Sequence, residues 1–100
     1  MRLTQEQIQS ITQTVFRLTG NGAEVYLFGS RLDDKAKGGD VDLFIETGTP
    51  LTLIQRAQIK LELESQLELP VDIVSQTRNT APTPFQVIAR AGAARLGAYR

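Results

Sequence analysis

The sequence contains neither cysteine nor histidine. The absence of cysteine excludes a disulfide framework, a thiolate zinc site and a cysteine nucleophile. The absence of histidine removes the commonest general base and the commonest transition-metal ligand. Any catalysis must therefore depend on carboxylates, hydroxyls, backbone amides or cations. A metal at such a site would be a hard ion bound by oxygen, Mg²⁺ or Mn²⁺.

An excess of charge and a long apolar run are also missing. The 11 basic residues balance 11 acidic ones, which argues against a strongly cationic nucleic-acid binder. No apolar run approaches the roughly 20 residues that span a bilayer, and the first residues, 1–6, do not resemble a signal peptide. We therefore expect a cytoplasmic protein that binds neither a membrane nor nucleic acid.

A chain of 100 residues fits one domain, residues 1–100, with one modest core. Apolar periodicity and turn residues predict helices at about 4–19, 52–67 and from 83 onward, and strands at 25–28, 40–46 and 71–74. One further helical turn is expected near 31–36. The order α-β-(α)-β-α-β-α predicts an α/β (α+β) fold, in which helices pack on a small mixed sheet.

The apolar positions of the helices predict which of their faces are buried. The second helix has a broad apolar face at Leu53, Ile54, Ala57 and Leu61. The last helix is expected to bury a row of four residues, Phe85, Ile88, Ala89 and Leu96. Thr4 with Gln7, and Thr83 with Gln86, match the capping box that begins a helix.

Three aspartates stand out within the predicted strands. Side chains alternate along a strand, so Asp40 and Asp42 share one face, opposite the apolar Val41 and Leu43. Neighbouring carboxylates repel each other unless a cation offsets their charge. If the third strand lies beside the second, Asp72 joins them and a metal site results. Alternatively, the pair lies on the wet face of an edge strand and Asp72 is a strand-end residue.

Gly29 and Ser30 follow a buried strand directly. Glycine lets the backbone approach a ligand closely, and serine offers a hydroxyl and an amide donor. A phosphate site fits these residues, as does a plain turn. Arg31 could add positive charge to a phosphate site or pair with Asp33 or Asp34 on the surface.

Together, these segments resemble the signature of polymerase-β-type nucleotidyltransferases. The segment Leu27-Phe28-Gly29-Ser30-Arg31, a spacer to Gly39, and then Asp40-Val41-Asp42-Leu43-Phe44-Ile45 matches the pattern hydrophobic-Gly-Ser, about ten residues, Asp-hydrophobic-Asp-hydrophobic. The short chain is most similar to the minimal nucleotidyltransferases, the MNT proteins that are often encoded beside HEPN-domain partners. The likeness covers about residues 5–97.

The resemblance implies a role for each matching residue. Gly29, Ser30 and Arg31 would hold the triphosphate of ATP or another nucleoside triphosphate. Asp40, Asp42 and Asp72 would be catalytic and would bind Mg²⁺, as two ions, with Mn²⁺ as the alternative metal. Asp72 would complete the metal site and could help to deprotonate the attacking hydroxyl.

The resemblance also implies an enzyme that transfers AMP to a tyrosine of a HEPN toxin and so acts as an antitoxin. The chain offers no acceptor domain of its own, so a partner protein is the expected acceptor, in a homo- or hetero-oligomer. Two alternatives remain open. One is a non-catalytic antitoxin that neutralises its partner by stoichiometric binding, and the other is an accessory domain whose nucleotide site only regulates assembly.

Overall fold

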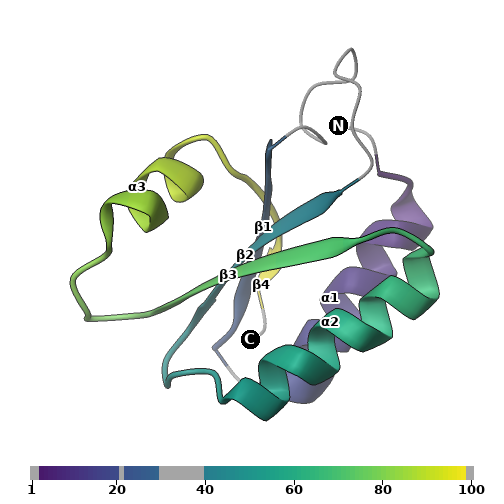
Figure 1. Cartoon of the computed structure of the whole chain (residues 1–100), viewed down its shortest axis with the longest axis horizontal. Coiled ribbons are helices and arrows are strands. Elements are labelled where there is room, and N and C mark those ends of the chain that lie inside the picture. Colours follow the sequence, from purple (N-terminus) through teal and green to yellow (C-terminus); the bar gives the residue numbers. More distant parts are fainter. Residues whose placement is uncertain (1–2, 21, 30–39, 99–100) are drawn as a thin grey trace.

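The computed structural model describes residues 3–20, 22–29 and 40–98. Within this part of the chain the elements, shown in Figure 1, follow the order α1 (Gln5–Thr19), β1 (Glu24–Phe28), β2 (Val41–Thr47), α2 (Leu53–Leu67), β3 (Val71–Thr77), α3 (Pro84–Ala91) and β4 (Ala94–Ala98). The expected helical turn near 31–36 lies outside the described residues. No helix in the described ranges is long and apolar enough to cross a membrane.

The strands form one mixed sheet in the order β3-β2-β1-β4. β1 pairs antiparallel with both β2 and β4, and β2 pairs parallel with β3. The parallel pair is joined by α2, the crossover connection that parallel strands require. The prediction of helices on a mixed α/β sheet is therefore confirmed.

Each helix begins at a threonine that is followed three residues later by glutamine. At Thr4, Thr52 and Thr83 the hydroxyl accepts a hydrogen bond from the backbone N–H of that glutamine, whose side chain accepts one from the threonine N–H. These reciprocal bonds satisfy N–H groups that have no partner inside the helix. They explain why the helices start where the sequence predicts.

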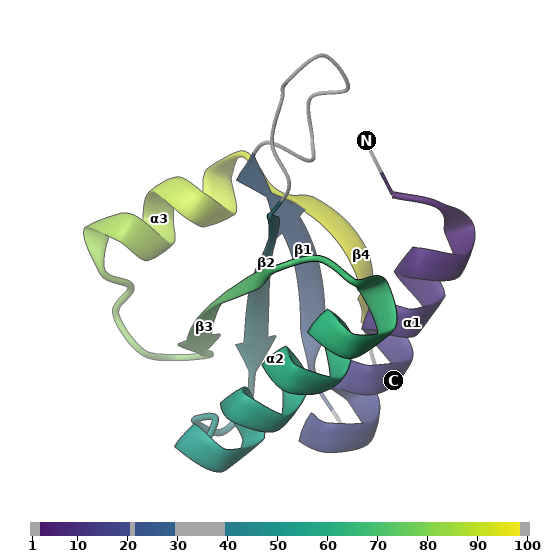
Figure 2. The same ribbon diagram turned by 45° about the vertical axis from the view of Figure 1, so that its right-hand side comes forward.

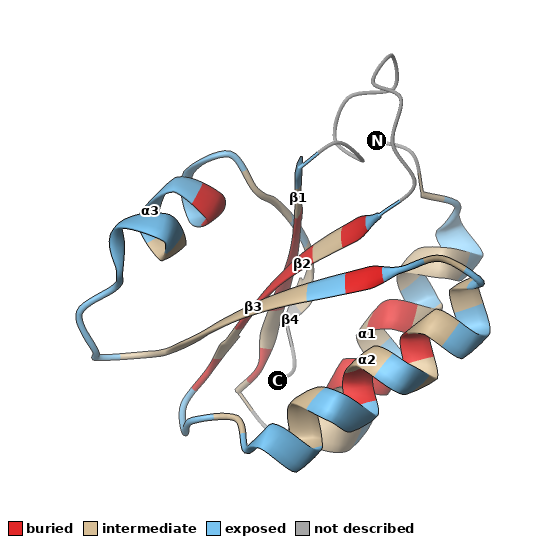
Figure 3. Cartoon of the chain, in the orientation of Figure 1, coloured by how far each residue is buried: buried red, intermediate tan, exposed pale blue. Residues whose placement is uncertain are grey.

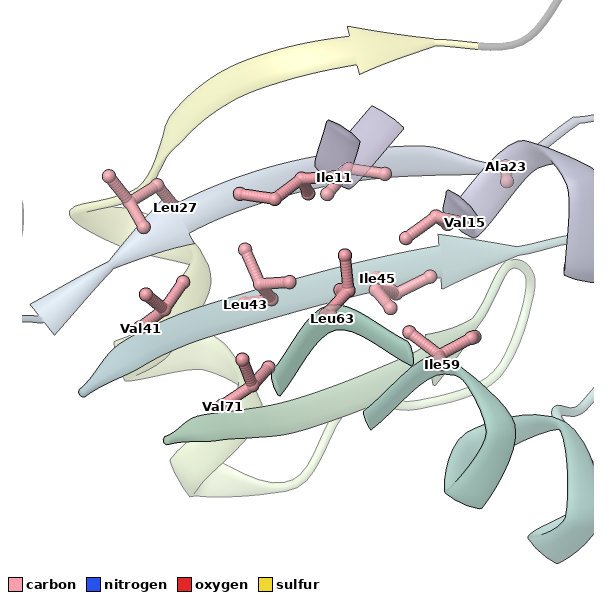
Figure 4. Close-up of a cluster of buried hydrophobic side chains, with 11 residues drawn as sticks. Ile11, Val15, Ala23, Leu27, Val41, Leu43, Ile45, Ile59, Leu63 and Val71 are labelled. Carbon is pink, nitrogen blue, oxygen red and sulfur yellow. The ribbon is translucent and has the colours of Figure 1, made fainter. Parts of the chain in front are cut away.

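The main core lies between the sheet and the pair α1 and α2, which lie side by side on one face (Figure 1 and Figure 4). Alternate residues of the two central strands point into it, and each helix adds an apolar row. The fully buried members are Ile11, Val15, Val25, Leu27, Val41, Leu43, Ile45, Ile59, Leu63 and Val71. At about 1.5–3 kcal/mol for each fully buried side chain, this layer is the main favourable contribution to folding.

The opposite face of the sheet carries α3 and a smaller cluster (Figure 2). Phe44 is fully buried there beside Tyr26 and Ala89. The Tyr26 and Phe44 rings meet edge to face, with centroids 6.1 Å apart. Much of α3 is itself exposed (Figure 3).

The predicted buried face of α2 is wrong. Leu53, Ile54 and Leu61 are 83%, 70% and 67% exposed, and the residues of α2 that are buried are Ile59 and Leu63. Residues four apart lie on one side of a helix, and this row continues to Leu67, which packs against the same core. The buried face of α2 is therefore the row of Ile59, Leu63 and Leu67, which packs on the main core. The row of Leu53, Ile54 and Leu61 lies on the exposed side of the helix.

The secondary structure predicted for the last residues is also wrong. The last helix ends at Ala91, and a further strand, β4, follows it. Leu96 belongs to β4, where it packs against the main core. On α3, Phe85 and Ile88 are 58% and 72% exposed, and only Ala89 of the predicted row is buried. β4 covers the open edge of β1, which would otherwise leave unpaired backbone groups.

Candidate active site

The alternation predicted for β2 is confirmed. Val41, Leu43 and Ile45 point into the main core, while Asp42 and Phe44 lie on the α3 face. Asp42 is half-buried, near the start of the strand. A carboxylate is thus held on a rigid strand, at the end of the sheet where β1 finishes and where β2 and β3 begin (Figure 1).

Asp72 occupies the matching position on the neighbouring strand. In the parallel ladder, Asp42 pairs with Asp72 in register, and adjacent strands lie about 4.8 Å apart. Residues paired in this way project to the same face of the sheet. The structure therefore brings these two predicted site residues together, one half-buried and one exposed.

The electrostatics of Asp42 reflect this arrangement. Burial raises the pKa of its carboxyl above the usual value, and the negative charges of Asp72 and Asp40 raise it further. The ionised form of Asp42 is therefore disfavoured in the metal-free protein. A bound cation would reverse both influences.

Asp40 lies just before β2 and is exposed. It is close enough to influence the pKa of Asp42. Within the described ranges, however, no three acidic side chains are grouped closely enough to form a metal-ligand cluster. The structure thus pairs Asp42 with Asp72, and the convergence of Asp40 on the same point stays a prediction.

Gly29 directly follows β1 and lies beside Asp42. Its φ is +78°, a left-handed conformation that suits glycine. A Cβ on Gly29 would overlap the Asp42 carboxylate, lying 3.1 Å from Cγ and 3.3 Å from Cβ of Asp42. The turn backbone and the carboxylate therefore lie in direct proximity. Ser30 and Arg31, predicted to bind phosphate with Gly29, lie outside the described residues.

Lys60 also lies close to Asp72, although no motif in the sequence points to it. Its Nζ lies 3.9 Å from Asp72 Oδ1, although Lys60 belongs to α2 on the other side of the sheet. The available signal was its spacing from Glu64, since residues four apart on a helix contact each other. That spacing could not reveal which strand the pair meets.

Solved structures share this fold. A protein described as a candidate minimal nucleotidyltransferase is 29% identical, with a TM-score of 0.69, over 89% of this chain and 88% of that one. The complex of a tri-AMPylated Shewanella oneidensis HEPN toxin with MNT antitoxin contains a chain that is 23% identical, with a TM-score of 0.72, over 96% of this chain and 73% of that one. A toxin–antitoxin structure with AMP-PNP matches at 23% identity and a TM-score of 0.73, over 93% and 74%.

A protein of Latilactobacillus sakei subsp. sakei strain 23K, named D-alanyl carrier protein, is 35% identical over 82 residues, 82% of this chain and 88% of the relative. Its name describes a different role from nucleotidyl transfer. The shared fold of the solved structures and the paired carboxylates beside the glycine turn agree instead with the family model "Polymerase beta, Nucleotidyltransferase", which matches residues 6–93. The chain belongs to the polymerase beta nucleotidyltransferase family.

Proposed function

We propose that this protein is a Mg²⁺-dependent nucleotidyltransferase that transfers AMP from ATP to a hydroxyl of a partner protein. One observation carries the proposal: Asp42 and Asp72 stand in register on one face of the sheet, with the Gly29 turn against Asp42. Carboxylates beside a close-approach backbone turn are the groups that a metal-bound triphosphate needs.

The donor set fits Mg²⁺. Carboxylate oxygens are the ligands that this ion prefers, and a cation would offset the burial and the neighbouring negative charges that raise the pKa of Asp42. Asp42 and Asp72 would hold the metal, with Asp40 as the third ligand. When bound, Mg²⁺ supplies positive charge that stabilises the phosphate oxygens during transfer.

The protein's own groups would then position the reactants. The Gly29 backbone, with Ser30 and Arg31, holds the triphosphate. The acceptor oxygen forms a bond to the α-phosphorus, the bond between the α- and β-phosphates breaks, and pyrophosphate leaves. The proton of the acceptor hydroxyl passes to a carboxylate of the aspartate pair, which acts as general base.

For the acceptor we propose a tyrosine of a HEPN toxin, so that the protein acts as an antitoxin. The proposal is supported by the fold shared with the MNT antitoxin that was captured with a tri-AMPylated HEPN toxin, and by the similar toxin–antitoxin chain that was captured with AMP-PNP. Asp72 is exposed and Asp42 is half-buried, so an acceptor can approach the carboxylate pair from solvent.

The test uses ATP labelled at the α-phosphate, Mg²⁺ and the protein together with the partner that co-purifies from its host. We expect label on the partner. Asp42→Asn and Asp72→Asn should lower labelling at least about a hundredfold, because a metal ligand contributes several kcal/mol to transition-state stabilisation. Glu6→Gln makes the same chemical change at an exposed position in the first turn of α1 and should label normally.

Labelling by Asp42→Asn at the wild-type rate would refute this mechanism. If no nucleotide labels the partner and Asp42→Asn still neutralises it, the protein acts as a stoichiometric antitoxin, since masking a surface requires no metal. Bound ATP without turnover in the presence of the partner would indicate a regulatory nucleotide site.

A further inference from the structure

The start of β3 is an exposed sheet edge that carries a site residue. Val41 N–H donates to Pro70 O at 2.9 Å, so residues 70 and 72 direct their backbone groups toward β2. In a parallel ladder the residue between them directs its groups the other way. The N–H and C=O of Val71 therefore face the open edge, next to Asp72.

Two side chains of α2 satisfy both of these backbone groups. Lys60 Nζ donates to Val71 O at 2.5 Å, and Glu64 Oε2 accepts from Val71 N–H at 2.9 Å. Lys60 and Glu64 also contact each other, at 3.6 Å. Because edge groups without partners are costly or invite pairing with another strand, this pair fixes the backbone immediately before Asp72.

Lys60 also forms an ion pair with the Asp72 side chain. Its ammonium lies 3.9 Å from Asp72 Oδ1, while that side chain is 60% exposed. An exposed carboxylate on an edge strand has little packing to select one rotamer. A cation that is already anchored by Val71 and Glu64 supplies the missing restraint.

We propose that Lys60 is a positioning residue for Asp72, holding its carboxylate in one orientation opposite Asp42 for metal binding. This inference rests on the proposed function. Replacement of a group that orients a metal ligand typically changes metal affinity about 10–100-fold, and the Lys60–Asp72 contact at 3.9 Å is an ion pair without a hydrogen bond. Because the ion pair is solvent-exposed and screened, the lower end of that range is expected.

Arg56 is the matched comparison on the same helix. Its Nη2 donates to Ile73 O at 2.8 Å, which is the same kind of edge contact two residues further along β3. Replacement of Arg56 removes only a hydrogen bond to the backbone of the β3 edge. Replacement of Lys60 removes such a hydrogen bond together with the contact to Asp72.

The sign of the effect separates positioning from simple electrostatics. An ammonium near the site repels a divalent cation, so removal of its charge alone would tighten metal binding. Loss of positioning would weaken it. The two explanations therefore predict opposite changes for Lys60→Met, a variant that keeps the length and flexibility of the side chain.

The experiment titrates Mn²⁺ into the nucleotide-free protein and measures free Mn²⁺ by electron paramagnetic resonance. We expect Lys60→Met to weaken binding about tenfold, Lys60→Arg to stay close to wild type, and Arg56→Met to leave the affinity unchanged. Thermal unfolding verifies that each variant is folded. If Lys60→Met does not fold, it is replaced by Lys60→Gln, which keeps a donor for Val71 O. This variant should also weaken Mn²⁺ binding.

Unchanged or tighter Mn²⁺ binding in the Lys60 variant overturns the inference, as does an equal loss in Arg56→Met. Asp42→Asn separates this failure from a failure of the proposed function. If the wild type binds Mn²⁺ and Asp42→Asn does not, the metal site stands whatever Lys60 does. If wild type and Asp42→Asn bind Mn²⁺ alike, the metal site itself is wrong.

Discussion

Gly29 and Asp42 are packed so closely that a single added methyl group on the glycine would overlap the carboxylate. Asp42 lies on β2, and Gly29 directly follows Phe28, the last residue of β1, which is in register with Asp42. This contact links the two halves of the sequence signature. The glycine must lack a side chain because the aspartate of the other half lies where that side chain would be.

Gly29→Ala should therefore displace the Asp42 carboxylate as well as strain the backbone. The left-handed conformation alone costs a non-glycine residue about 1–2 kcal/mol. Gly20→Ala is the control for backbone strain, because Gly20, with φ +80° and ψ −155°, has a backbone conformation restricted to glycine but nothing within 4 Å of its added Cβ. Both variants should lower the free energy of unfolding, as measured by urea denaturation, because each places a side chain on a backbone conformation that favours glycine.

Only Gly29→Ala should also lose Mn²⁺ binding and partner labelling. If the two glycine variants lose activity to the same extent, the loss comes from backbone strain in general and the Gly29–Asp42 contact has no special role.

Asp42→Asn should stabilise the metal-free protein while it abolishes transfer. The variant removes a charge that is disfavoured by burial and by two neighbouring aspartates. Because the site is open to solvent, screening limits the gain to about 0.5 kcal/mol, or about 2–4 °C in Tm for a domain of this size. Mg²⁺ should raise the Tm of the wild type and leave that of Asp42→Asn unchanged. A Tm that falls in Asp42→Asn would show that the carboxylate has a structural role.

Local signals in the sequence predicted much of this fold. The Thr-x-x-Gln boxes mark helix starts because their hydrogen bonds involve only residues within one turn. The alternation of residues in β2 predicted on which face of the sheet Asp42 lies, because side chains of a strand point to one of only two faces. The partnership of Asp42 with Asp72 required one assumption, that β2 and β3 are neighbours, and the sheet confirms it.

The features that were missed depend on tertiary contacts. Residues 94–98 (Ala-Arg-Leu-Gly-Ala) contain no β-branched or aromatic side chain, and they form β4 because the edge of β1 is open to pairing. Lys60 could not be assigned from its helix position, because its partners lie on a strand that begins eleven residues later. Both results come from pairing between segments, which a local pattern does not encode.

The cap at Thr83 should matter more to its helix than the cap at Thr4 does. α3 buries only Ala89 among its apolar residues, whereas α1 buries Ile11 and Val15. Loss of an N-cap hydroxyl costs about 1 kcal/mol. Thr83→Ala should therefore speed amide hydrogen exchange throughout 85–91 about fivefold, while Thr4→Ala should affect only the first turn of α1. Equal effects on both helices would mean that the burial of Ala89 and the contacts of Arg90 with Tyr26 hold α3 in place without its cap.

At the other end of the sheet, Tyr26 donates a hydrogen bond to Glu24 Oε2. Arg90 covers the Tyr26 ring, with its guanidinium carbon 4.0 Å from the centroid, and donates to the tyrosine hydroxyl at 3.2 Å. Arg78 bridges Glu24 and Glu46, at 3.6 and 3.1 Å. This network connects β1 to α3 and to the end of β3, so it should control how stability depends on pH.

The hydrogen bond from Tyr26 lowers the pKa of Glu24, with Arg95, Arg78 and Arg90 adding to it against the opposing effect of burial. A carboxylate whose pKa is lower in the folded state contributes stability that is fully present above its usual pKa of 4.5. That contribution is lost as the pH falls through the folded pKa. Burial, followed by the bond to Glu24, raises the pKa of Tyr26 above its usual 10.0, so its contribution is lost as the pH rises through the raised value.

Tyr26→Phe should therefore flatten both limbs of a plot of Tm against pH. The acid limb flattens because Glu24 loses its main donor, and the alkaline limb flattens because the titrating hydroxyl is gone. Thermal unfolding from about pH 3 to about pH 11 measures both limbs. In a Glu24→Gln background the same substitution should no longer change the acid limb, since Glu24, the carboxylate whose pKa Tyr26 lowers, is then absent. An acid limb that stays as steep in Tyr26→Phe as in the wild type would assign the lowered pKa of Glu24 to the arginines instead.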